Sequence, residues 1–163
     1  MTPLKLSAAV VAIIMGLGFG VALSMEPPPD PAWGRLFHSH ADIARVLDAA
    51  IAQRTDPAVA TIGNTNEYLI HEVRREKDGA PAIHPGWTEL HFILDGSATL
   101  VIGGKINPRI PTGPGSVEGG MSQQVKKGDA IVVPPNTVHA YYHINGAVTY
   151  LEVRMISPSA TVN

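Results

Sequence analysis

The sequence predicts an all-β domain, a sandwich or barrel of short strands, preceded by one helix. Three observations support this. The chain has 16 glycines and 14 prolines among 163 residues, which is typical of many turns and few long helices. Short runs of β-branched residues alternate with turn dipeptides. Only one segment repeats its apolar residues at helical spacing. No internal repeat is present, so the chain has room for a single domain.

Residues 1–24 resemble a secretory signal peptide. Lys5 supplies the positive start, an uncharged apolar run extends from Leu6 to Leu23, and Ala22 and Ser24 are the small residues that a signal peptidase reads. We expect cleavage after Ser24 and an exported domain, periplasmic or secreted. The alternative is an uncleaved anchor, which is the one way in which the chain would contact a membrane, because the apolar run approaches the length of a membrane span.

Residues 25–66 are predicted to be a linker and the one helix. Four prolines between residues 25 and 33 favour an extended linker. Ser39 is the predicted N-cap of the helix, and proline at position 57 ends it, because the residue before a proline is pushed out of helical geometry. The apolar face of this helix consists of Ile43, Val46, Leu47, Ala50 and Ile51.

Residues 67–157 are predicted to form the barrel domain. The dipeptide Asp95-Gly96 predicts a hairpin, and Asn145-Gly146 predicts a tight turn between the last two strands. The segment 105–124 has no period and is predicted to be a long loop over a barrel mouth. The predicted strands are Glu67–Arg75, Glu89–Leu94, Thr99–Ile102, Ala130–Val133, Val138–Ile144 and Val148–Ile156.

The strand that begins at Glu89 has two contrasting faces. Alternation places the polar Glu89 and His91 on one face, and the apolar Leu90, Phe92 and Leu94 on the other. The polar pair requires a cavity. The apolar set requires a cover, which is either the predicted helix or the partner subunit of a homodimer.

Charge and cysteine content exclude several classes of function. The net charge of −2 and the absence of a Lys/Arg cluster argue against nucleic acid as a partner. The chain has no cysteine, so disulfides, thiolate metal sites and cysteine nucleophiles are excluded. An exported domain of this kind must be stabilised by a hydrophobic core, a metal or oligomerisation.

Four residues are candidate metal ligands: His84, Glu89, His91 and His139. Two or three imidazoles with one carboxylate suit one divalent transition metal, Fe, Mn, Zn, Ni or Cu. On the strand after His139, Tyr141 and His143 are expected on the same face, which makes them candidates for proton transfer. The alternatives are a buried structural tyrosine and a surface histidine at the end of the strand. Arg154, on the last strand, is expected either to bind a substrate carboxylate or to pair at the surface.

Two motifs make the chain resemble a small single-domain cupin. The second cupin motif is complete and consists of Gly128, Pro134, Asn136 and His139, whereas the first is matched by His84, Glu89 and Gly96. The resemblance implies a jelly-roll β-barrel with a metal in its cavity and a small-molecule ligand, and it adds to the expectation of a dimer. Ala82 stands where metal-binding cupins have their first histidine, which leaves two alternatives, loss of the metal or replacement of the ligand by His91.

The resemblance implies either of two functions. One is a metal-dependent enzyme acting on a small oxygen-rich organic molecule, with dioxygenase, decarboxylase, lyase and isomerase chemistry all represented in the superfamily. The other is a non-catalytic cupin that binds a small ligand or a metal. Fold resemblance alone does not separate catalysis from binding.

Overall fold

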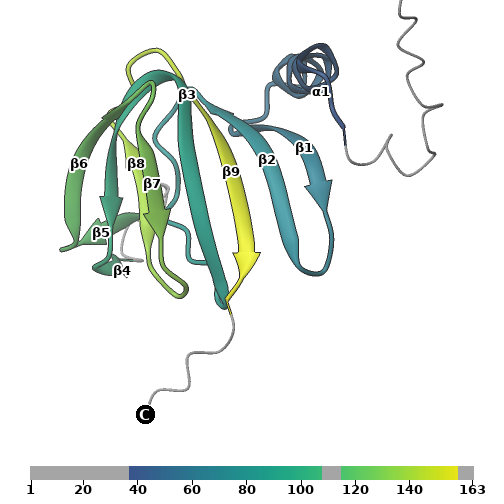
Figure 1. Cartoon of the computed structure of the whole chain (residues 1–163). Coiled ribbons are helices and arrows are strands. Elements are labelled where there is room, and N and C mark those ends of the chain that lie inside the picture. The colour runs from purple at the N-terminus through teal and green to yellow at the C-terminus, as the bar shows by residue number, and fades with distance from the viewer. Residues whose placement is uncertain (1–36, 108–114, 158–163) are drawn as a thin grey trace, which may run out of the picture.

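The computed structural model describes residues 37–107 and 115–157. The predicted signal peptide and the proline-rich linker lie outside the described residues. The described part holds one helix, α1 (His40–Ala52), and nine strands (Figure 1). The strands are β1 (Ala58–Asn64), β2 (Tyr68–Arg75), β3 (Trp87–Ile102), β4 (Lys105–Asn107), β5 (Ser116–Glu118), β6 (Met121–Lys126), β7 (Ala130–Val133), β8 (His139–Tyr142) and β9 (Val148–Ile156).

The long strand β3 joins two halves of the barrel. Its first half pairs with β9 and β7, and β9 continues the sheet to β2 and β1. Its second half pairs with β6 and β8. All these pairings are antiparallel, and Figure 1 shows the strands side by side from β6 across β3 to β1. The arrangement confirms the predicted all-β jelly-roll barrel with one N-terminal helix.

The predicted hairpin at Asp95-Gly96 is wrong, because β3 runs straight through these residues. The register with β9 shifts between Ile93 and Asp95, as in a β-bulge. Gly96 has a φ of +77°, and a Cβ atom there would lie 1.9 Å from the carbonyl oxygen of Ala147. Gly96 therefore permits a bulge in β3 and a close approach of the Ala147 backbone. The sequence pattern had suggested that the chain reverses direction here.

Two segments predicted to be irregular contain strands. β1 lies within the predicted linker-and-helix region and pairs with β2, so the sheet begins before residue 67. In the predicted loop 105–124, β4 pairs with β5, and β6 is part of the barrel. β9 has the predicted bounds, and β7 does as well.

The helix packs at one edge of the sheet. Ser39 caps it by accepting a hydrogen bond from the Asp42 backbone N–H at 3.1 Å, as predicted. Leu47 packs against Ala58 and Ala60 of β1, and Figure 1 shows α1 beside β1 and β2. The helix therefore does not cover the apolar outer face of β3, which corrects that alternative. Within the described ranges, no helix has both the length and the apolar character needed to cross a membrane.

The hydrophobic core lies between the two halves of the barrel. It is formed by side chains from both halves of β3 together with β8 and β9, including the fully buried Ile93, Leu100, Val148 and Tyr150. On the N-terminal side of Ile93, the buried residues on the inner face of β3 are the polar His91 and Glu89. The core therefore fills one part of the barrel and leaves the polar part for the candidate site.

Candidate metal centre

Strand β3 carries two of the candidate ligands into the interior. The side chains of Glu89 and His91 are almost fully buried, while Phe92 on the opposite face is exposed. This is the alternation expected of a strand with one face toward a cavity. The prediction that Glu89 and His91 share an inner face is therefore confirmed.

His84, Glu89 and His139 converge at this point. Their potential ligand atoms lie within 4.8 Å of one another. Nδ1 of His84 is 2.8 Å from Oε1 of Glu89, and Nε2 of His139 is 3.8 Å from Oε2 of the same carboxylate. A carboxylate and two imidazoles in this arrangement can share one metal ion.

Backbone contacts explain why these segments meet. His139 follows a corner in which Asn136 has a φ of +59°, a conformation that asparagine tolerates better than most residues. The segment before β3 then pairs with β8 through an isolated bridge between Ala82 and His139, with reciprocal N–H to carbonyl distances of 2.9 and 3.0 Å. This bridge places His84 beside His139.

The ring of His139 is oriented by the backbone, with its second nitrogen directed at Glu89. Its Nδ1 lies 3.3 Å from the carbonyl oxygen of Thr137, so Nδ1–H donates and Nε2 is left as the free acceptor facing Glu89. Burial also lowers the pKa of His139, against the opposing charge of Glu89. The neutral imidazole, which is the form that binds metals, is therefore favoured.

Glu89 is a buried carboxylate whose pKa is lowered by its neighbours. Burial alone would raise its pKa, but hydrogen bonds with His84 and His91 and the charges of the neighbouring histidines hold the pKa well below its usual range. An ionised carboxylate in the interior requires compensating charge or hydrogen bonds. A divalent cation at this position would supply that compensation.

His91 lies beside Glu89 but belongs to a second, overlapping group. Its Nε2 is 3.4 Å from Oε2 of Glu89 and 3.8 Å from Oε2 of Glu152. Its Nδ1 is 2.8 Å from the hydroxyl of Tyr141. Potential ligand atoms of Glu89, His91 and Glu152 also lie within 4.8 Å of one another. His91 is therefore next to the first group, and its role as a fourth ligand stays a prediction.

The two predicted proton-transfer residues are in different environments. Tyr141 is buried, lines the barrel cavity and hydrogen-bonds with His91, and burial raises its pKa well above the usual range for tyrosine. His143 is exposed and has a φ of +50°, because β8 ends at Tyr142. The expectation that His143 shares a strand face with His139 and Tyr141 is therefore wrong.

Strand β9 adds two charged residues to the site: Glu152, which was not predicted there, and Arg154, for which binding of a substrate carboxylate was one of two expectations. Glu152 of β9 lies opposite His91, and Arg154 lies opposite Glu89. Nε of Arg154 is 2.6 Å from Oε1 of Glu152 and 3.4 Å from Oε2 of Glu89. The alternation of Tyr150, Glu152 and Arg154 was the one available signal, but it did not indicate which strands flank β9.

A small cavity adjoins these groups. Its volume is about 90 Å³, which is enough for several waters or a few-carbon molecule and far below the several hundred Å³ of drug-sized sites. The lining combines alanines with charged and aromatic side chains. The lining residues are Arg75, Ala80, Ala82, His84, His139, Ala140, Tyr141, Tyr150, Glu152 and Arg154.

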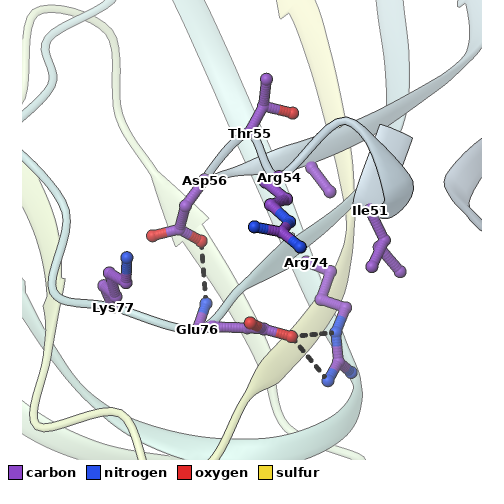
Figure 2. A pocket seen from close by; sticks show the side chains of 8 residues that line it. Ile51, Arg54, Thr55, Asp56, Arg74, Glu76 and Lys77 are labelled. Atoms are coloured by element: carbon purple, nitrogen blue, oxygen red, sulfur yellow. Dashed lines mark hydrogen bonds and ion pairs between the residues drawn. The ribbon is translucent and has the colours of Figure 1, made fainter. Parts of the chain in front are cut away.

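A larger hollow of about 250 Å³ lies where α1 ends against β1 and β2 (Figure 2). Its polar groups pair with one another: the Arg74 guanidinium donates to Glu76, and the Glu76 backbone N–H donates to Asp56 at 2.9 Å. No histidine lines it. The smaller barrel cavity is therefore the candidate site, because it is lined by histidines next to buried carboxylates.

Comparison with known proteins supports the family assignment. The sequence model of the cupin domain matches residues 70–154, more than half of the chain. No curated protein matches. Among solved structures, one from Thermus thermophilus is 13% identical with a TM-score of 0.52 and covers 75% of this chain and 98% of its own. One from Bacillus halodurans is 14% identical with a TM-score of 0.51 and covers 80% and 84%.

Sequence identities this low show a shared fold and do not extend to a shared activity or ligand. Membership of the cupin family accounts for the two sequence motifs and the barrel. It also accounts for the buried histidine and glutamate residues. The chain belongs to the cupin family.

Proposed function

We propose that this cupin binds one divalent transition metal through His84, Glu89 and His139, and that a small oxygen-rich organic molecule binds beside the metal. The observation that carries the proposal is the buried carboxylate of Glu89 inside the barrel, with imidazole nitrogens of His84 and His139 within 4 Å of its oxygens. His91 is proposed as the fourth ligand. A bound metal would supply Lewis acidity or redox chemistry.

The residues around the proposed metal position its ligands and limit access. Thr137 holds His139 in one tautomer, and Tyr141 contacts the far nitrogen of His91. Because burial raises the pKa of Tyr141, its hydroxyl keeps its proton and can donate a hydrogen bond to a ligand in the cavity. The cavity of about 90 Å³ limits a bound molecule to a few carbons. These features suit either turnover or tight binding of a small molecule.

Metal analysis tests this proposal. Purified protein loaded separately with Fe, Mn, Zn, Ni or Cu is expected to retain about one ion per chain after dialysis, as measured by elemental analysis. His139→Ala is expected to lose the ion, because the variant removes one of three ligands. His143→Ala is the matched control, since His143 is exposed outside the site. Failure of the unmodified protein to retain any of the five metals would refute the proposal.

His91→Ala tests the fourth ligand separately. If His91 binds the metal, this variant loses most of its metal affinity while remaining folded, and the loss resembles that of His139→Ala. Retention of metal with the affinity of the unmodified protein would leave His84, Glu89 and His139 as the complete set and would contradict the proposed role of His91.

We propose that the domain is exported and that residues 1–24 are removed. The support is the sequence pattern of Lys5, the apolar run and Ser24. N-terminal sequencing of the protein from its native cells is expected to begin at Met25, in the periplasmic or secreted fraction. An intact N-terminus in the membrane fraction would instead favour the uncleaved anchor.

We propose that a second copy of the chain covers the outer face of β7, β3 and β9, giving a homodimer. Phe92, Val132 and Met155 on this face are 42%, 61% and 46% exposed, and cross-strand pairing makes their face continuous with Leu90 and Val153. An apolar sheet face of this kind suits a self-complementary contact.

Light scattering tests the dimer. The mature protein is expected to have twice the mass of one chain, and Val132→Glu is expected to reduce it to a monomer. Met121→Glu is the control, because Met121 is 67% exposed on β6 in the other half of the barrel. A monomeric unmodified protein would contradict the proposal.

A further inference from the structure

Arg154 is a cation inside the barrel whose hydrogen bonding is incomplete. Its Nε and Oε1 of Glu152 are buried and 2.6 Å apart, yet their angles do not form a hydrogen bond. In the described part of the chain, the two terminal nitrogens of this guanidinium donate no hydrogen bond either. Arg154 lines the small cavity beside His84 and His139. Its donors are therefore available to a molecule in that cavity.

Arg75 brings a second guanidinium to the same cavity. It comes from β2, and its Nε donates to the hydroxyl of Tyr150 at 2.9 Å. Its Nη1 lies 2.6 Å from where a Cβ of Gly79 would be, so the backbone of that glycine passes directly over the guanidinium. This contact, together with the hydrogen bond from the Gly79 N–H to the Tyr141 carbonyl at 3.1 Å, holds Arg75 against the cavity wall.

The charges around the cavity favour an anion once a metal is bound. Glu89 and Glu152 contribute two negative charges, and Arg75 and Arg154 offset them. With neutral imidazoles, a divalent cation would leave the cavity with two positive charges in surroundings of low dielectric constant. A neutral ligand would leave that excess uncompensated, whereas one carboxylate would halve it and two would balance it.

Shape leads to the same ligand class. A guanidinium presents two parallel N–H donors that match the two oxygens of a carboxylate. The volume of about 90 Å³ restricts the ligand to a few carbons. Ala82, on the wall beside His139, leaves the space into which a larger side chain would project.

We infer that the cavity binds a small mono- or dicarboxylate, and that the guanidinium of Arg154 receives one of its carboxylate groups. This inference rests on the proposed metal site and names the ligand class of that site. Arg154 is the residue that determines specificity for an acid over a neutral molecule of the same shape. Arg75 adds a second positive charge to the lining of the cavity.

Binding of malonate compared with malonamide tests the inference. Malonamide has nearly the shape of malonate but no charge. Isothermal titration of the metal-loaded protein at constant ionic strength is expected to give at least about tenfold tighter binding of malonate. Arg154→Met is expected to weaken malonate binding by about 10- to 100-fold and to leave malonamide binding unchanged. Arg154→Lys keeps the positive charge but loses the two parallel N–H donors of the guanidinium, so an intermediate affinity for malonate is expected.

Arg74→Met is the matched control. Arg74 is on β2, pairs with Glu76 away from the barrel cavity, and its replacement changes the net charge by the same amount. Malonate affinity in this variant should equal that of the unmodified protein. Equal binding of malonate and malonamide, or full malonate affinity in folded Arg154→Met, would overturn the inference. If Arg154→Met does not fold, two other measurements test the inference. These are the comparison of malonate with malonamide in the unmodified protein and the malonate affinity of Arg154→Lys.

Metal content, measured on the same samples, separates the two proposals. Retained metal with malonate binding that is indifferent to Arg154 would refute the carboxylate site and leave the metal site standing. Absence of metal, with a preference for malonate that still depends on Arg154, would refute the metal site and support the carboxylate site.

Discussion

Ala82 is the residue at which this chain departs from the metal-binding cupin pattern, and its surroundings show what the departure changes. It pairs with His139 and lines the cavity next to His84. A histidine at this position would project into the same space as the proposed ligand. The alanine thus removes one donor and leaves room beside the proposed metal.

Ala82→His is expected to strengthen metal binding and weaken ligand binding. An added imidazole would supply a further metal ligand, and complete four-ligand zinc sites reach about 10–16 kcal/mol, so a single ligand is expected to change the affinity by at least about tenfold. Competition with a chelator measures the metal affinity, and malonate titration measures the loss of space. Ala80→His is the control, because Ala80 lines the cavity without the bridge to His139. Equal metal affinities in both variants would show that the position of Ala82 has no special role.

Tyr141→Phe separates two roles of the tyrosine. The variant removes the hydroxyl that lies 2.8 Å from Nδ1 of His91 and is expected to lower the free energy of unfolding of the metal-free protein by about 0.5–1.5 kcal/mol. If His91 is a ligand, loss of its orienting partner should also weaken metal binding by about 10- to 100-fold. Urea unfolding and chelator competition measure the two effects. A change in stability with no change in metal affinity would contradict ligation by His91.

At the scale of elements, the barrel depends on β3 passing from one half of the sheet to the other. Its first half carries Glu89 and His91, and its second half pairs with the strand that carries His139. The bulge near Gly96 lies between the two halves. A change at this glycine would therefore disturb the site through the strand, without touching any ligand.

Gly96→Ala is expected to destabilise the protein more than another glycine substitution with the same backbone strain. Both Gly96 and Gly128 have positive φ, which costs an alanine about 1–2 kcal/mol. At Gly96 the added Cβ would also meet the Ala147 carbonyl at 1.9 Å, whereas at Gly128 nothing lies within 4 Å. The clash adds about 1–3 kcal/mol. Urea unfolding of both variants measures the difference, and equal losses would contradict the role given to the close contact.

The sequence predicted the fold class and most of the inward-facing candidate ligands for identifiable reasons. Alternation along 89–93 showed which side chains share a face, and the Pro-Pro-Asn corner placed His139 at the start of a strand. The course of β3 could not be predicted, because an Asp-Gly pair suits both a hairpin and a bulge, and the contact that decides, with Ala147, is distant in sequence. β1 was missed because its Ala-Val-Ala-Thr run lies directly after the helix and lacks a polar/apolar alternation.

The charged half of the site was not predictable for a different reason. Alternation on β9 shows that Glu152 and Arg154 share a face, but it does not reveal that β9 lies between β2 and β3. Only that strand order places Arg154 opposite Glu89 and brings Arg75 to the same cavity. Sequence motifs therefore located the proposed metal ligands, and three-dimensional pairing was needed to locate the groups around them.

At the scale of the whole molecule, the buried titratable groups make stability depend on pH in one direction. Burial lowers the pKa values of His71 and His139 below the usual 6.5. The unfolded chain therefore binds more protons than the folded chain as pH falls through 6.5, and stability decreases. Glu89 acts in the same direction at lower pH: its folded pKa lies below the usual 4.5, so its contribution is present above 4.5 and is lost as pH falls further.

The metal-free protein is accordingly expected to lose stability on acidification from pH 7 to 5, and to lose more below pH 4.5. Urea midpoints at pH 7, 6, 5 and 4 measure this, and His71→Gln, which lies outside the proposed ligand set, should reduce the change between pH 7 and 5. Added metal should raise the midpoint most at pH 7, because protons compete with it for the imidazoles. A midpoint that stays constant or rises between pH 7 and 5 would contradict the assignment of neutral buried histidines. A metal effect that is independent of pH would mean that the bound ion does not use them.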